Sequence, residues 1–319
     1  MIWKLVFSLL LIVAGTGLGY LLKIRGILKE KHAGEIAKWV LVTVLSFILL
    51  LSFWNIKFTD LKVLSLPVIG TIISFMGIAW GLIMWKAQKF NIDQAGSYIF
   101  SSALSNILYF GTFLCLVLFG ERGYDLSLIY AVYYNLFFFI VCLPLAKVLS
   151  ARKGRSIAGE LSVAKFIFDV KNIPILAIAL GIVISFLNIP IPRIMLDIRN
   201  VLVPINTFLL VLSTGVGLRI HSARRHFKEI STMFGYKFLI VPVVTILLSF
   251  SFGLLGSKDY LAFKVLLVQG SMPTAVNATV LINLFDFDKD VGSSLFLYTH
   301  AFLIIQVPLL MLLFYLLKI

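Results

Sequence analysis

Charged residues are scarce in this sequence. Asp, Glu, Lys and Arg together make up 13% of the 319 residues, whereas roughly 25% is usual in soluble domains. The hydrophobic share is 61% and the mean hydropathy is +1.04. Because so apolar a chain needs lipid as its solvent, the composition excludes an ordinary soluble domain and indicates an integral membrane protein.

Several other features are rare or missing. The two cysteines, Cys115 and Cys142, both lie in apolar runs, so no disulfide framework is expected. No Asp or Glu lies deep in any of the apolar runs, which argues against a buried carboxylate as proton carrier. No metal-ligand cluster or membrane-protease signature is visible, so we expect no metal, no cofactor and no enzymatic activity. The first run is too long for a signal peptide and lacks a cleavage site, so we expect a retained helix.

Ten apolar runs, each near the ~20 residues that a membrane-spanning helix needs, follow one another along the chain. They cover residues 2–22, 36–54, 65–86, 99–119, 126–147, 173–188, 200–218, 231–252, 260–284 and 292–317. We therefore predict an all-α integral membrane protein with ten transmembrane helices. The sixth run is short and the ninth is interrupted.

The formal net charge of +14 is distributed asymmetrically. If the N-terminus lies outside, the inner loops hold most of the Lys and Arg, and the positive-inside rule is satisfied through all ten helices. We therefore predict a multi-pass protein of the cell (inner) membrane with both termini outside. Topology and contact with anionic lipid account for the charge, so nucleic acid is not expected as a partner.

The longest polar segment, residues 148–171, separates five runs from five. An odd number of helices in each half means that the second half enters the membrane from the side opposite to the first. If residues 1–147 and 172–319 share a fold, they are inverted repeats, an arrangement that many transporters use. We expect residues 148–171 to be a cytoplasmic linker.

A proline and several polar residues interrupt the ninth run near its middle. The stretch VQGSMPTAVNATV, residues 268–280, contains Ser271, Pro273, Thr274 and Asn277. Proline removes a backbone N–H and clashes with the preceding turn, so we expect a break in the helix. In lipid, the freed backbone groups must find partners or line a wet cavity, and these side chains can supply some partners.

The fourth run, residues 99–119, is interrupted at the corresponding place in the first half, where Asn106 and Gly111 lie. Paired interruptions of this kind point to the binding site of a transporter. If the two breaks cross, the N-terminal helix ends suit a carboxylate and the C-terminal ends suit a cation. The alternative is that each break is only a structural kink.

Three ionisable residues inside the predicted spans need an explanation: Lys237, Lys264 and His300. Lys264 is near the outer end of the ninth span, and we expect it to extend to the surface. Lys237 either contributes to a site or extends towards the inner surface. His300 either packs with a hydrogen bond or exchanges a proton. Coupling of transport to H+, to Na+ or to no ion therefore stays open.

The sequence resembles the auxin efflux carrier family, which includes plant exporters and bacterial permeases for malate and similar anions. The resemblance runs nearly end to end. It rests on KNIPILAIALGIVISFLNIPIP (residues 171–192), STGVGLRI (213–220), YKFLIVP (236–242), MPTAVN (272–277) and, in the fourth run, Asn106, Tyr109 and Gly111. Phe113 stands where the family has a proline, which leaves the shape of the first break open.

The resemblance implies two inverted five-helix repeats. Spans 1, 2, 6 and 7 would form a scaffold that often dimerises, and spans 3–5 and 8–10 would form a transport domain in which discontinuous spans 4 and 9 cross at the substrate. Carried over by position, it nominates Asn106, Tyr109, Gly111, Pro273 and Asn277, with Lys237 as a supporting cation.

We therefore predict a secondary transporter of a small organic anion that works by an elevator-type mechanism. The predicted substrate-binding residues are Asn106, Tyr109, Gly111, Ser271, Pro273, Thr274 and Asn277, with Lys237 and His300 as supporting or coupling residues. The alternatives are a sodium-coupled symporter of the bile-acid type and a non-transporting membrane sensor that kept the fold.

Overall fold

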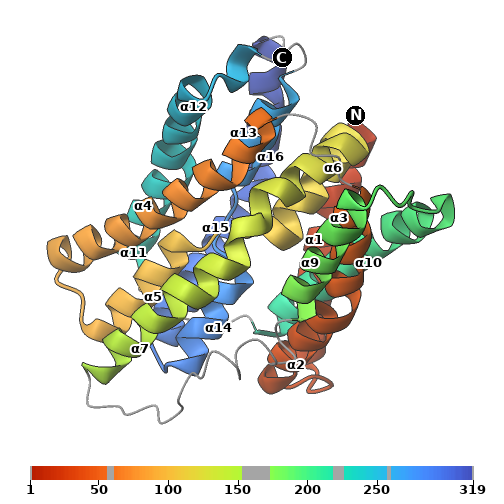
Figure 1. The fold of residues 1–319 in the computed structure, drawn as a ribbon. Coiled ribbons are helices and arrows are strands. Elements are labelled where there is room, and N and C mark those ends of the chain that lie inside the picture. Colours follow the sequence, from red (N-terminus) through yellow and green to blue (C-terminus); the bar gives the residue numbers. More distant parts are fainter. Residues whose placement is uncertain (1, 56–60, 153–172, 218–225, 257–259, 318–319) are drawn as a thin grey trace. The chain divides into compact units, whose positions relative to one another are not determined.

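The computed structural model describes residues 2–55, 61–152, 173–217, 226–256 and 260–317 (Figure 1). Every regular element among them is a helix, and the single strand-like pairing is an isolated bridge between Ser105 and Thr274. The prediction of an all-α protein is therefore confirmed for the described part of the chain. Of the predicted linker, residues 148–171, only residues 148–152 are among the described residues.

The helices gather into two compact units. Unit 1 contains α1 (Ile2–Ile24), α2 (Glu30–Val40), the π-helical turn η1 (Leu41–Leu45), α3 (Ser46–Asn55), α9 (Ile173–Phe186), α10 (Arg193–Gly217) and the stretch Leu116–Leu128 of α6 (Thr112–Phe137). Within it, α1 packs along α10 and α3 packs along α9. Large apolar side chains such as Leu180, Val183 and Val201 are more than half exposed on this unit, which suits contact with lipid.

Glycines allow α1 and α10 to approach closely. A Cβ atom on Gly19 would overlap the carbonyl oxygen of Leu212, and a Cβ on Gly215 would overlap the carbonyl oxygen of Thr16. Because lipid-embedded helices gain little from the hydrophobic effect between them, such close backbone contact is a main source of their association.

A buried ionic cluster joins α10 to the Leu116–Leu128 stretch of α6 inside unit 1. The fully buried Arg199 guanidinium lies 3.4 Å from the carboxylate of Asp125 and 3.7 Å from that of Glu121, and it stands 5.4 Å from the centre of the Tyr124 ring. Arg199 lies just outside the predicted seventh span, residues 200–218. α10 begins earlier than predicted, at Arg193, and the ion pair compensates the burial of Arg199 within it.

Unit 2 contains the remaining described helices. They are η2 (Leu61–Leu64), α4 (Ser65–Ala87), α5 (Ile92–Ala103), η3 (Ile107–Gly111), the rest of α6, η4 (Phe138–Cys142), α7 (Leu143–Ala151), α11 (Phe227–Gly235), η7 (Tyr236–Ile240), α12 (Val241–Ser251), η8 (Leu254–Gly256), α13 (Leu261–Gly270), α14 (Val276–Leu284), α15 (Lys289–Ala301) and α16 (Leu303–Leu316). A capping box starts α5: Asn91 accepts from the Gln94 N–H at 2.9 Å, and the Gln94 side chain accepts from the Asn91 N–H.

Four described helical stretches are long and apolar enough to cross a membrane: Ser65–Ala87, Thr112–Ala151, Arg193–Gly217 and Phe227–Ser251. α15 and α16 would make a fifth span together. They were predicted as one run, 292–317, but they bend by 42° at Phe302. The expected loop between the fourth and fifth runs reduces to Gly120, which leaves the helical conformation with a φ of 72° that glycine adopts without steric cost.

Candidate functional site

The two predicted breaks both occur within unit 2. In the fourth run, α5 ends at Ala103, Leu104 is extended, and helix resumes with η3 at Ile107. In the ninth run, α13 ends at Gly270 and α14 begins at Val276, with an extended Ala275 before it. Each break therefore interrupts a buried segment and leaves one half-helix before it and one after it.

The breaks cross and pair with each other. Ser105 and Thr274 form an antiparallel bridge. The Asn106 N–H donates to the carbonyl of Pro273 at 2.8 Å, and the Ala275 N–H donates to the carbonyl of Leu104 at 2.9 Å. Backbone groups released from one helix are thereby satisfied by those released from the other, as an environment without water requires.

Two threonines reinforce this crossing. The hydroxyl of Thr274 donates to the carbonyl of Ser101 at 3.2 Å, in the last turn of α5. The Thr274 N–H in turn donates to the hydroxyl of Thr299 on α15 at 3.2 Å. Two helices, α5 and α15, therefore fix the position of the second break through the fully buried Thr274.

Lys237, from the π-helical turn η7, reaches the end of α5. Its ammonium lies 2.9 Å from the hydroxyl of Ser105, 3.4 Å from the carbonyl of Ser102 and 3.5 Å from the carbonyl of Leu104. The residue is 1% exposed, so its ammonium does not extend to the surface. Its partners in the described part of the chain are all neutral oxygens.

His300 on α15 holds the side chain of Asn106. The ring Nδ1 lies 2.8 Å from the carbonyl of Phe296, which only a protonated Nδ1 can satisfy. In the neutral ring Nε2 is then an acceptor, and the Asn106 amide nitrogen donates to it at 3.1 Å. The Asn106 Oδ1 atom is buried and has no hydrogen-bond partner within the described segments. The Asn106 amide oxygen can therefore still accept a hydrogen bond, for example from a bound ligand.

At the C-terminal end of α13, a neutral side chain takes up a free carbonyl, whereas at the end of α5 a lysine does so. The side-chain amide of Gln306, from α16, donates to the carbonyl of Ser271. Gly111 lies beside this helix, and a Cβ there would overlap the amide oxygen of the buried Gln269. Gly111 was predicted to bind substrate, and the structure gives it a packing contact between η3 and α13.

The structure places most of the predicted site residues in this crossing. Asn106, Pro273, Thr274, Lys237 and His300 come together there through the contacts above, whereas Ser271 lies at the end of α13. Asn277 is in the first turn of α14 and is 9% exposed. The backbone of Tyr109 belongs to η3, and its side chain lies outside what the structure describes.

Sequence reasoning missed Thr299 and Gln306. Both are polar residues in the apolar run 292–317, and their spacing of seven residues would place them near one face if that run were a single helix. That spacing is the signal that could have found them. Phe113, which stands where the related family has a proline, is buried in the first turn of α6.

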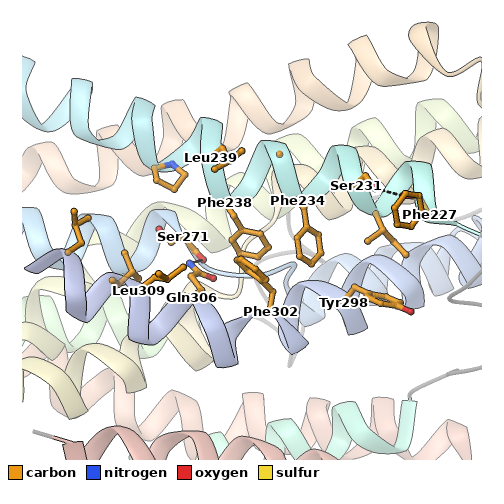
Figure 2. Close-up of a pocket in the computed structure, with 15 residues that line it drawn as sticks. Phe227, Ser231, Phe234, Phe238, Leu239, Ser271, Tyr298, Phe302, Gln306 and Leu309 are labelled. Atoms are coloured by element: carbon orange, nitrogen blue, oxygen red, sulfur yellow. Dashed lines mark hydrogen bonds between the residues drawn. The ribbon is translucent and has the colours of Figure 1, made fainter.

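An apolar groove opens elsewhere on unit 2. It has a volume of about 1020 Å³ and lies between α11–η7–α12 and α15–α16. Figure 2 shows the rings of Phe234, Phe238 and Phe302 gathered in it, with Ser271 and Gln306 side by side. The ring centres of the three phenylalanines are 4.6–5.2 Å apart. Among the described residues that line the groove, none is charged, so they offer no counter-charge to an ionised substrate.

Apolar helices of spanning length and two discontinuous helices that cross define an integral membrane protein of the transporter class. The chain belongs to the family described as Membrane transport protein, whose model matches residues 2–311. The predicted relation to the auxin efflux carrier family is thereby confirmed. Relatives of this chain are transporters, which agrees with the expectation that it is not an enzyme.

Two archaeal proteins align with nearly the whole chain. An uncharacterized transporter of Methanocaldococcus jannaschii is 29% identical over 298 residues, covering 90% of this chain and 92% of its own length. An uncharacterized transporter of Methanothermobacter thermautotrophicus is 24% identical over 311 residues and 95% of each chain.

Proposed function

We propose that this protein is a secondary transporter of a small organic anion with a carboxylate group, and that the crossing of the two broken helices is its binding site. The observation that carries the proposal is the buried ammonium of Lys237 at the crossing. A charge inside a membrane protein is costly and commonly marks a substrate or ion pathway. Because no carboxylate of the described residues pairs with Lys237, an anionic substrate complements it.

The half-helix ends supply a second attraction for an anion. The N-terminal ends of η3 and α14 begin immediately after the crossing, at Ile107 and Val276. Helix N-termini carry partial positive charge and free N–H groups, which favour carboxylates. Asn106, Thr274 and Asn277 are polar side chains within two residues of these two ends along the chain.

Each nominated residue then has a defined role. Asn106 and Asn277 contact the substrate, and His300 positions Asn106 through the hydrogen bond to its amide. Pro273, Thr274 and Gly111 shape the two breaks. Ser271 and Tyr109 complete the lining, on the strength of their places in the ninth and fourth runs.

We further propose that transport follows an elevator mechanism, in which unit 2 moves and unit 1 is the scaffold. The division of the described helices into these two compact units supports this assignment. Ten spans in two inverted five-helix repeats, a homodimer formed through unit 1, and both termini outside the inner membrane belong to the same proposal.

The test is uptake by the purified full-length protein in liposomes. Short mono- and dicarboxylates are compared with their neutral amides, which have similar size but no charge. We expect saturable uptake of at least one carboxylate and none of its amide. Absence of both uptake and ligand-induced thermal stabilisation for every carboxylate would contradict the proposal, and tight binding without flux would favour a sensor.

A further inference from the structure

We propose that the apolar groove of unit 2 binds a neutral, single-chain lipid of the surrounding membrane, whose hydroxyl headgroup reaches Ser271 and Gln306 (Figure 2). The groove is built from residues of unit 2 alone. The proposal concerns a second binding site, and it does not depend on the transport of a carboxylate.

The groove has the size and the lining of a site for an apolar chain. Its volume of about 1020 Å³ lies at the upper end of the range for ligand pockets, roughly 300–1,000 Å³. Apart from four polar residues, its described lining is apolar or aromatic. Phe227, Leu239 and Leu309 in this lining are more than half exposed, so the groove presents apolar surface that an acyl chain can cover.

Two polar atoms of the groove's lining have no hydrogen-bond partner among the described residues. Ser271 and Gln306 are 1% and 5% exposed. The Gln306 amide nitrogen donates to the carbonyl of Ser271, which leaves the amide oxygen Oε1 free. This Oε1 atom and the Ser271 Oγ atom are both buried and unpaired within the described segments. Because an unsatisfied buried polar group is unfavourable, both atoms favour a ligand that forms hydrogen bonds with them.

The chemistry of these two atoms selects the headgroup. Gln306 Oε1 can only accept a hydrogen bond, whereas the Ser271 hydroxyl can donate one. A ligand hydroxyl satisfies both, because it donates to Oε1 and accepts from the serine. An ionised carboxylate or sulfate has no proton to donate to Oε1, and the described lining of the groove holds no charge to compensate it. The headgroup is therefore a neutral hydroxyl.

The depth of the polar pair in the membrane favours the same class of lipid. Ser271 directly follows α13, in the break near the middle of the ninth apolar run. A charged headgroup is costly at that depth, whereas a neutral hydroxyl on one chain can reach it. One wall of the groove runs from Phe227 to Pro242, which is roughly 20 Å of helix at 1.5 Å per residue. An extended acyl chain can lie along this wall.

The experiment is photolabelling of the full-length protein in lipid nanodiscs with a long-chain fatty alcohol that carries a diazirine in its tail. Mass spectrometry locates the labelled residues. Three compounds of equal chain length compete with the probe: the plain alcohol, its methyl ether and the alkyl sulfate. The ether keeps an acceptor but has lost the donor, and the sulfate is ionised.

Two pairs of variants test the tail and the headgroup separately. Gly235→Trp fills the groove without straining the backbone, because Gly235 has helical φ and ψ and a Cβ there meets open space. Gly235→Ala is its control. Ser271→Ala removes one headgroup partner. Ser231→Ala is the control for it, because Ser231 also lines the groove but its hydroxyl already donates to the carbonyl of Phe227 at 2.8 Å.

We expect saturable labelling of the helices that line the groove in wild type and in both control variants. In wild type the alcohol should compete roughly tenfold better than the ether or the sulfate, since each hydrogen bond lost to a buried partner leaves that partner unsatisfied. Ser271→Ala should reduce this preference and keep or raise the melting temperature measured without probe, because the hydroxyl that it removes is unpaired within the described segments. Gly235→Trp should lose the saturable labelling.

Equal competition by all three compounds would overturn the proposal, as would labelling of wild type only outside the groove or unchanged labelling in Gly235→Trp. If Gly235→Trp does not fold, Leu239→Trp takes its place, because the Leu239 side chain is 68% exposed on the same wall. The readout involves no transport, so a failure to find carboxylate uptake leaves the result unaffected.

Discussion

The N–H of Asn106 donates to the carbonyl of Pro273 at 2.8 Å, and this bond joins the two broken helices. The residues are far apart in sequence, and each lies in an interruption that would be unfavourable in lipid by itself. Together with the bond from Ala275 to Leu104, the contact turns two isolated defects into one paired structure. Each break therefore supplies hydrogen-bond partners that the other lacks.

Replacement of the site asparagines should reduce transport without unfolding the protein. Asn106→Ala removes the hydrogen bond to His300, and Asn277→Ala removes a polar group from the first turn of α14. We expect uptake of the carboxylate to fall at least tenfold in each. Asn283→Ala is the control, since Asn283 is an exposed residue of the same helix. Wild-type rates in both site variants would remove the asparagines from the site.

His300 should act by positioning Asn106. In His300→Leu the Asn106 amide loses its acceptor, and a buried donor without a partner costs about 1–3 kcal/mol. In His300→Gln the side-chain oxygen can still accept this bond. We expect uptake to be strongly reduced in the leucine variant and largely retained in the glutamine variant, measured at equal amounts of folded protein. Equal loss in both variants would instead indicate that the imidazole itself takes part.

Close packing of α1 on α10 should depend on Gly19. A Cβ at this position meets the backbone of Leu212, and we expect Gly19→Ala to destabilise unit 1 by about 1–3 kcal/mol. Gly17 is the matched control, because a Cβ there has open space around it. Gly17→Ala should be neutral or stabilise by up to about 1 kcal/mol, since alanine favours helix. Thermal unfolding in one detergent checks both variants, and equal melting temperatures would contradict the packing.

The buried pair of Arg199 and Asp125 should behave as a coupled unit. Removing one partner of a buried ion pair typically costs about 3–5 kcal/mol. We expect less here, because Asp125 is part-exposed and Arg199 keeps Glu121 at 3.7 Å when Asp125 is replaced. We expect Arg199→Met and Asp125→Leu each to lower the melting temperature, and the double variant to be more stable than the sum of the two losses implies. Strict additivity in this double-mutant cycle would show that the two side chains do not interact in the membrane.

The sequence predicted the parts of the site that depend on local chemistry. Pro273 cannot continue a helix, and Asn106 is a polar residue in an apolar run, so both interruptions could be located from composition and spacing alone. The family could be recognised for the same reason, because MPTAVN and the positions around Asn106 are short, contiguous patterns.

Other features could not be read from the sequence because they depend on which segments meet. Lys237 is one lysine in an apolar run, and nothing local distinguishes extension towards the surface from contact with the end of α5. From the sequence, Arg199 likewise looks like a loop residue, and only the structure shows that Asp125 and Glu121 pair with it. The roles of Thr299 and Gln306 also appear only when α15 and α16 lie against the second break.

By itself, then, the sequence determined that the chain is helical, membrane-embedded and broken in two places, because hydropathy and proline chemistry act over a few residues. The tertiary structure alone decided that the two breaks satisfy each other and that a buried ammonium closes one helix end. Hydrogen bonds and charge compensation in a medium without water depend on partners distant in sequence, and only the folded chain brings those partners within reach.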